Sequence, residues 1–279
     1  MSSRQLLAFG LASRIPGGFF LQNLIERRGL LFQLVRRDFQ QRFVGSVVGW
    51  VWGLIHPLVL LVTWTYVFSV CLKQTLPKGQ PGTYPLFIFA GMLPWLLFSD
   101  TVQRSSSSLV EQASLITKTI FPAEMVPLSV FLSSLVSHLL ALVLMLVATE
   151  IEVRSLGLPL AILPFYMLLL GMLAVGIGWV VAALQVYLRD TAQFVTVILT
   201  AWFWMTPIFI FEDQVPKAFR VLVYANPLAS VVRAYRDVLL STRVPGWREV
   251  APLAVVSIGV FFVGGLVFRH LKRGFADVL

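Results

Sequence analysis

Three histidines and two acidic residues are the side chains of this sequence best suited to metal or acid–base chemistry. His56, His138 and His270 lie far apart, in the first and third apolar segments and near the C-terminus. Their spacing is not that of zinc ligands. Asp100 and Glu124 flank one polar connection, and nothing in the sequence pairs them as acid and base. The motifs H-E-x-x-H, C-x-x-C and G-x-S-x-G do not occur, so we expect neither catalysis nor a metal site.

Nucleotide binding through a phosphate loop requires a lysine directly after a glycine, in the pattern G-x-x-x-x-G-K-[ST]. No lysine of this sequence follows a glycine. We therefore expect no ATP site of this kind, and no cofactor, in this chain. The single cysteine, Cys71, excludes an intramolecular disulfide, and we interpret it as a small apolar residue of a membrane segment.

Composition indicates an integral membrane protein. Of the 279 residues, 58% are hydrophobic and 13% are charged. Soluble domains typically hold ~45–50% apolar and ~25% charged residues. The net charge of +9 does not predict a nucleic-acid partner, because the basic residues flank the apolar segments: seven precede Trp50, and the tail carries Arg269, Lys272 and Arg273.

Six apolar segments are long enough for helices that cross a bilayer, which needs ~17–25 residues. They are residues 47–72, 85–102, 125–149, 159–188, 194–211 and 252–268. Six spans put both termini on one side. If that side is cytoplasmic, 13 basic residues are internal and nine are external, six of them in the segment 212–251. We therefore predict an all-α membrane protein with both termini cytoplasmic.

The predicted organisation is one transmembrane domain over residues 1–279. Residues 1–44 form a cytoplasmic lead-in and interface helix, residues 45–270 a six-span core, and residues 271–279 a cytoplasmic tail. In the interface helix, Arg36 and Arg37 oppose an apolar stripe at helical spacing, made of Phe32, Val35, Phe39 and Phe43. Such a helix lies in the membrane interface. It serves either as a simple anchor or also as a docking face for a cytoplasmic partner.

The first apolar segment carries glycines at a four-residue spacing. Gly45, Gly49 and Gly53 predict a face that another helix approaches closely. Pro57 cannot donate a hydrogen bond to the carbonyl of Gly53, so a kink is expected there. His56 either fills a polar hole at this kink or lines a pathway, and we favour the structural role.

The segment between the fifth and sixth spans contains a second amphipathic helix. Asn226-Pro227 predicts an N-cap followed by proline at the first helical position. This helix is too short to span and lies on the outer surface or re-enters the membrane. It accounts for the external basic residues as parts of a folded element. Among them, we predict that Arg233 and Arg236 contact an anionic headgroup of the substrate.

Six motifs follow one another along the chain from about Arg36 to the tail: RDFQQRFVGSVVGWVWGLIHPL, GMLPWLLF, SLITKTIFPAEMVPLS, LQVYLRDT, TPIFIFEDQVP and NPLASVVRAYRDVLL. In this order they resemble the membrane subunit of ABC exporters of the ABC-2 type, specifically the permeases for O-antigen, capsule and teichoic acid. The chain departs from that pattern at His56, where glutamine is expected.

The resemblance implies a homodimer of this chain, paired with two separate ATPase subunits that bind the ATP and magnesium. It implies a lipid-linked polysaccharide as substrate and a bacterial inner (cytoplasmic) membrane as location. The interface helix and the segment after the second span are expected to transmit ATP-driven motion. On these segments we predict coupling residues at Arg36, Arg37, Glu111 and Lys118.

The resemblance also implies that the first and fifth spans line the export channel. Sugar rings present apolar C–H faces, which an aromatic wall contacts without holding any hydroxyl tightly. We therefore predict a substrate pathway along five residues: Trp52, Trp64, Tyr66, Trp202 and Trp204. The competing interpretation is an aromatic belt at the membrane interface or ordinary packing.

Two other functions stay open at this point. One is an ABC-2 permease for a drug or another lipid, which would not need a wide glycan path. The other is a membrane-embedded enzyme acting on a polyprenyl-linked sugar, which would need an intramembrane acid–base pair that the sequence does not display.

Overall fold

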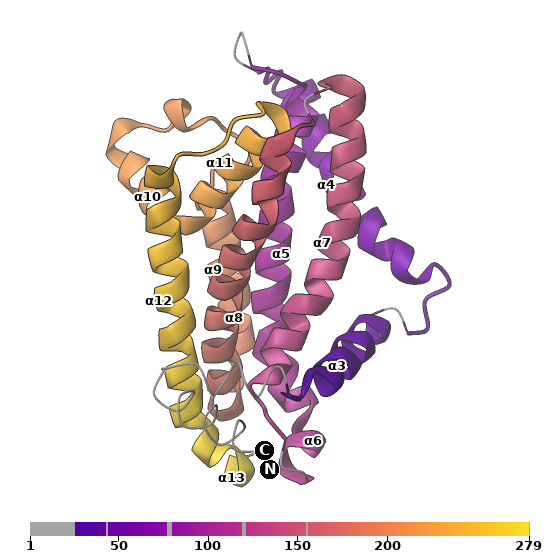
Figure 1. Ribbon diagram of the computed structural model, residues 1–279, viewed down its shortest axis with the longest axis vertical. Helices are drawn as coiled ribbons and strands as arrows, with labels where there is room; N and C mark the ends of the chain where they lie inside the picture. Colours follow the sequence, from indigo (N-terminus) through magenta and orange to yellow (C-terminus); the bar gives the residue numbers. More distant parts are fainter. Residues whose placement is uncertain (1–25, 43, 77–79, 119–120, 155, 279) are drawn as a thin grey trace, which may run out of the picture.

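The computed structural model describes residues 26–42, 44–76, 80–118, 121–154 and 156–278. All regular elements in these ranges are helices, which confirms the predicted all-α class. Figure 1 shows an upright bundle, with α3, α6 and α13 at one end and α10 and α11 at the other. We call these the α13 end and the α11 end. The main helices are α3 (Arg28–Gln41), α4 (Trp52–Thr65), α5 (Tyr84–Glu111), α6 (Ala113–Lys118), α7 (Met125–Glu152), α8 (Leu163–Tyr187), α9 (Thr191–Met205), α10 (Arg220–Ala225), α11 (Pro227–Leu240), α12 (Trp247–Leu271) and α13 (Phe275–Val278).

Five helical segments of the described chain are long and apolar enough to cross a membrane: Gly49–Cys71, Tyr84–Glu111, Met125–Glu152, Leu158–Tyr187 and Trp247–Gly274. The predicted fifth span, residues 194–211, is shorter than expected. Its helix α9 has 15 residues, or ~22 Å at 1.5 Å per residue, against a hydrocarbon core of ~30 Å. It ends because Thr206 precedes Pro207, and the residue before a proline is disfavoured in the α conformation.

The second predicted span, residues 85–102, continues to Glu111 as one helix. In the polar run that follows residue 102, most of the serine hydroxyls find partners within the helix, whereas Ser105 Oγ is buried without one. Ser106 donates to the carbonyl of Gln103 and Ser108 to that of Ser105. The buried serines therefore pack between helices as small residues.

Gly45 and Gly49 do not lie on a helical face of the first span as predicted; of the three glycines only Gly53 lies inside α4. Gly45 lies outside the helix with φ +79°, and Gly49 starts a 3-10 turn with φ +58°. An added Cβ at either glycine would meet nothing within 4 Å. These glycines serve an irregular turn into α4, since only glycine adopts such φ values readily. Pro57 lies inside α4 as expected.

Helix α5 is the centre of the bundle and packs against α7, α8, α9 and α11. Helices α8 and α12 approach each other closely at Gly176 and Gly264. A Cβ built on Gly264 would lie 2.1 Å from the carbonyl oxygen of Gly176. By contrast, α4 is peripheral: Pro57 is the one buried residue between Gly49 and Cys71.

Helix α3 crosses the bundle obliquely and rests on α7 near the α13 end (Figure 1). The predicted apolar stripe is only partly buried. Leu34, which is not one of its members, is the buried residue of α3, while Phe32 is 67% exposed. Phe43 lies outside the described residues, as do residues 1–25 of the predicted lead-in.

Candidate transport cavity

A cavity of about 590 Å³ lies between α4, α5, α7 and α9. Its walls change character along the bundle. Along α5, the apolar residues Leu93, Leu96 and Leu97 come first, toward the α11 end, and Asp100 and Gln103 follow toward the α13 end. The polar part is completed by further side chains from α7, α9 and the end of α3: Ser134, Ser137, Thr196, Thr200 and Arg42. His138 lines the cavity nearer to Leu93. The cavity thus offers apolar surface at one end and hydroxyl, amide and charged groups at the other.

Two of the five predicted pathway residues line this cavity. Trp52 opens α4 and is 48% exposed. Trp64, three turns further along, is partly buried. Its ring centroid lies 5.3 Å from that of Phe203 and 4.9 Å from that of Phe209, at angles typical of favourable aromatic pairs. Phe203 also lines the cavity, so α4 and α9 meet there through aromatic rings.

The other three predicted pathway residues are not among the described residues that line the cavity. Tyr66 and Trp204 are 60% and 63% exposed. Trp202 has a structural partner: its indole N–H donates to Oδ1 of Asn226 over 2.9 Å. The same oxygen accepts from the backbone N–H of Leu228, which confirms Asn226 as the N-cap of α11.

Several residues of the cavity were not predicted as pathway residues. Trp95 of α5, Gln103 and the α9 threonines carry no sequence signal beyond their type. Asp100 and His138 do carry one, because ionisable residues within membrane segments are functional candidates. His138 is held in place: Nδ1 lies 3.2 Å from the carbonyl oxygen of Leu93, and Nε2 lies 3.0 Å from the hydroxyl of Tyr235. His56, for which two roles were open, is exposed on the cavity wall.

The basic residues near the α11 end are parts of a folded segment, as predicted. Arg236 lies over the ring of Phe87, and its guanidinium donates to the carbonyls of Phe87, Pro207 and Ile208. It therefore holds the irregular chain after α9 against α5. Its predicted headgroup contact stays a prediction.

Arg233 pairs with Glu212 at 3.2 Å. Burial raises the pKa of Glu212, and the nearby guanidinium of Arg233 opposes that rise. Arg233 also lines a small pocket of about 200 Å³ at the α11 end, together with Arg248, Tyr166 and Tyr224. Glu249 lines the same pocket, and Arg233 is already paired with Glu212, so the predicted headgroup contact of Arg233 stays a prediction.

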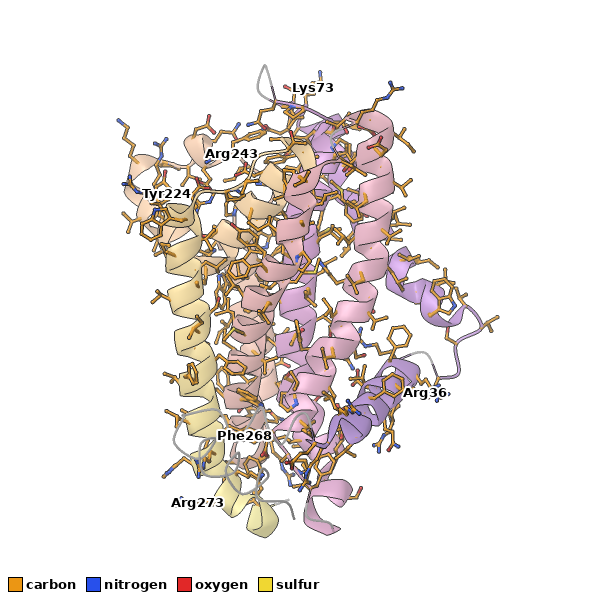
Figure 2. All side chains as sticks on the ribbon, viewed as in Figure 1. Arg36, Lys73, Tyr224, Arg243, Phe268 and Arg273 are labelled. Carbon is orange, nitrogen blue, oxygen red and sulfur yellow. The ribbon has the colours of Figure 1, made fainter. Side chains whose placement is uncertain are left out.

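The predicted coupling residues lie near the α13 end. Arg36 and Arg37 are exposed on α3, and Figure 2 places Arg36 on the side turned away from the bundle. Glu111 is exposed at the end of α5, where Ser107 donates to its carboxylate over 2.6 Å. The backbone of Lys118 ends α6, and its side chain lies outside the described residues. Within the described ranges no group of His, Cys, Asp and Glu is placed to hold a metal ion.

Comparisons with known proteins agree with this architecture. The chain is 29% identical to the O-antigen export system permease protein RfbA of Myxococcus xanthus over 259 residues, covering 92% of this chain and 98% of the relative. It is 27% identical to the protein of the same name from Klebsiella pneumoniae over 254 residues, covering 90% and 95%. It is 22% identical to the polysialic acid transport protein KpsM of Escherichia coli over 242 residues, covering 85% and 91%. The family model described as ABC-2 type transporter matches residues 29–240, and the chain therefore belongs to the ABC-2 type transporter family.

Proposed function

We propose that this chain is the permease subunit of an ATP-driven exporter that moves a lipid-linked polysaccharide across the bacterial inner membrane. The names of its relatives, O-antigen and polysialic acid export proteins, support a polysaccharide substrate. Separate ATPase subunits, two for each pair of permeases, supply the ATP hydrolysis. This division of labour is supported by the sequence, in which no lysine follows a glycine as a phosphate loop requires.

The observation that carries the proposal is the cavity beside two poorly covered helices. Between Gly49 and Cys71 only Pro57 is buried, and α9 buries only Thr191, Val195 and Leu199. Both helices also form walls of the cavity. If two copies of the chain meet through α4 and α9, each cavity joins that of its partner and a continuous path results. The homodimer is thus part of the proposal.

The wall chemistry suits a polymer of sugars. Aromatic rings such as Trp52, Trp64 and Trp95 contact the C–H faces of sugar rings, and neutral groups such as Thr196 and Gln103 exchange hydrogen bonds with hydroxyls. Each such contact is weak against water, with a net value of ~0.5–1.5 kcal/mol per hydrogen bond. A long polymer can therefore bind at many points and still advance.

The α13 end faces the cytoplasm in this proposal, and the ATPase subunits dock on the surface that contains Arg36, Arg37, Glu111 and Lys118. Basic residues gather there: Figure 2 shows Arg36 and Arg273 toward this end. Cytoplasmic flanks of membrane helices are enriched in lysine and arginine. The membrane lipids are the remaining partners, and no nucleic acid is involved.

The test is export by cells or proteoliposomes that contain the permease and its ATPase subunit. Trp64→Ala, on the cavity wall, should reduce the amount of polymer exported. Trp247→Ala serves as the matched control, because Trp247 is exposed at the start of α12, outside the cavity and outside α4 and α9. Equal export by both variants at equal membrane levels would contradict the cavity as the polymer path. The competing substrate classes would be favoured by a different result. The parent protein would then export no polymer, and Trp64→Ala would transport a small drug or a bare lipid at an undiminished rate.

A further inference from the structure

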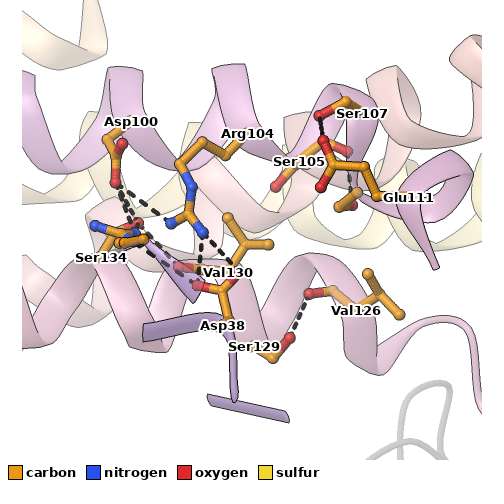
Figure 3. Close-up of polar contacts among 12 residues, drawn as sticks. Asp38, Asp100, Arg104, Ser105, Ser107, Glu111, Val126, Ser129, Val130 and Ser134 are labelled. Atoms are coloured by element: carbon orange, nitrogen blue, oxygen red, sulfur yellow. Dashed lines mark hydrogen bonds and ion pairs between the residues drawn. The ribbon is translucent and has the colours of Figure 1, made fainter. Parts of the chain in front are cut away.

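The C-terminal turn of α3 is joined to α5 by four charged residues, which we call the α3 clamp: Asp38, Arg42, Asp100 and Arg104. Nη2 of Arg42 lies 2.9 Å from the carboxylate of Asp100, and Nη2 of Arg104 lies 2.6 Å from that of Asp38. Contacts of 3.8 Å and 3.7 Å complete the ring, between Arg42 and Asp38 on α3 and between Arg104 and Asp100 on α5. Figure 3 shows Asp38 and Arg104 facing each other, with Asp100 and Ser134 beside them.

The clamp is electrically neutral and partly buried. It contains two cations and two anions, and their side chains are 12–39% exposed. Helix α7 also takes part: Arg42 donates to Ser134 over 2.7 Å and to Ser137 over 3.3 Å. Removal of one partner leaves the opposite charge partly buried and without compensation, which is unfavourable. The four residues therefore hold as a unit.

The covalent connection between α3 and α4 is, in contrast, irregular. Residues 44–48 form no helix, and Gly45 and Gly49 that bound the turn have positive φ angles. Val44 and Val47 are 78% and 104% exposed, so this connection packs little against the bundle. A shift of α3 therefore has no rigid helical route into α4. The side-chain contacts of α3 with α5 and α7 therefore connect α3 to the bundle more rigidly than the chain segment 44–48 does.

The clamp also reaches the transport cavity. Arg42 and Asp100, which pair with each other, both line its polar part, as do Ser134 and Ser137. A displacement of α3 that is carried by the clamp must therefore move wall groups of the cavity. The outer face of the same helix carries Arg36 and Arg37.

We infer that the α3 clamp is the positioning device that transmits a displacement of α3 to α5, α7 and the cavity. This inference rests on the proposed function, because it takes the displacement of α3 to come from an ATPase subunit. It assigns to Asp38, Arg42, Asp100 and Arg104 a role in coupling that is distinct from docking of the ATPase.

The test uses the full exporter, permease with its ATPase subunit, in proteoliposomes. The neutral variants Asp38→Asn and Arg104→Gln break the clamp. In a variant with all four charges exchanged (D38R/R42D/D100R/R104D), every contact again joins opposite charges. Arg243→Gln is the control, since it removes an ion pair with Asp237 at the α11 end. The readouts are assembly with the ATPase, ATP hydrolysis and polymer exported per ATP.

We expect the neutral variants to assemble and hydrolyse ATP, while export per ATP falls about tenfold, a change within the range of measured couplings between sites. The exchanged variant should recover most of that loss, and Arg243→Gln should behave like the parent. Unchanged export per ATP in Asp38→Asn and Arg104→Gln overturns the inference, as does failure of the exchanged variant to recover while it still assembles. Loss of assembly in all clamp variants would reduce the clamp to a structural tether, which also overturns it. The proposed docking surface is tested separately with Arg37→Glu. If that variant still assembles with the ATPase, the docking assignment is wrong, whatever the clamp variants show.

Discussion

Replacement of Gly264 by alanine should destabilise the contact between α8 and α12. The added Cβ would lie 2.1 Å from the carbonyl oxygen of Gly176 and 2.9 Å from its Cα. Real Cβ atoms essentially never approach within 3.0 Å of another heavy atom, so the two helices must separate by about 1 Å. Inserting a methyl group into a well-packed contact typically costs ~1–3 kcal/mol. The gain in helix propensity from glycine to alanine, ~1 kcal/mol, offsets part of that cost.

The same helix supplies the control for this substitution. An added Cβ at Gly259 meets nothing within 4 Å. Gly259→Ala should therefore show only the gain in propensity and leave the protein as stable as the parent or slightly more so. Thermal unfolding of the purified permease in detergent measures both variants. We expect a lower midpoint for Gly264→Ala and an unchanged or higher one for Gly259→Ala. Equal midpoints for the two variants would refute the close packing of α8 on α12.

Three further predictions concern other parts of the molecule. Arg236→Met should lower the thermal midpoint in the same assay, because three backbone carbonyls lose a charged donor, each such bond being worth ~1.5–3 kcal/mol; an unchanged midpoint would show that water replaces the guanidinium. Charge reversal in Arg37→Glu or Glu111→Lys should reduce export or ATPase assembly without loss of membrane insertion, because both side chains are exposed near the α13 end; full activity of both variants argues against a docking surface there. With exposed Cys71 replaced by serine, a cysteine at position 114 should react with a thiol reagent only after the membrane is opened, and labelling of intact cells from outside would invert the proposed orientation.

The outcome for the aromatic residues shows how far a spacing argument reaches. All five predicted pathway residues lie on the two helical segments, Gly49–Cys71 and α9, that border the cavity, but only Trp52 and Trp64 line it. The direction of each side chain depends on the rotation of its helix about its own axis. For α9, that rotation is set by contacts such as the hydrogen bond from Trp202 to Asn226, 24 residues further along the chain. A tryptophan at the right height can thus face away from the path.

The length of helices shows a similar limit. The proline after Thr206 was visible in the sequence, but the apolar residues beyond it, up to Phe211, extended the predicted fifth span too far. For the second span, polarity suggested an end near Val102, and yet the helix runs to Glu111. Hydropathy measures the solvent that a segment prefers. The end of a helix depends instead on whether its backbone groups find partners, and beyond Val102 the helix stays packed in the bundle through buried serines such as Ser105 and Ser108.

The sequence by itself determined the membrane class, the all-α architecture, the approximate place of the apolar helices and the cap at Asn226, because these follow from composition, local periodicity and residue conformational preferences. It also carried the family motifs. Only the tertiary structure decided that Arg42 meets Asp100 and that Arg104 meets Asp38. It likewise decided that Gly264, not the glycines near α4, makes the close helix contact. The two ion pairs of the clamp join residues that lie 58 and 66 positions apart in the chain. The helical periodicity of a sequence shows which residues share a face of one helix. Which residue of another helix that face contacts, and whether a cavity lies between them, depends on how several helices pack together.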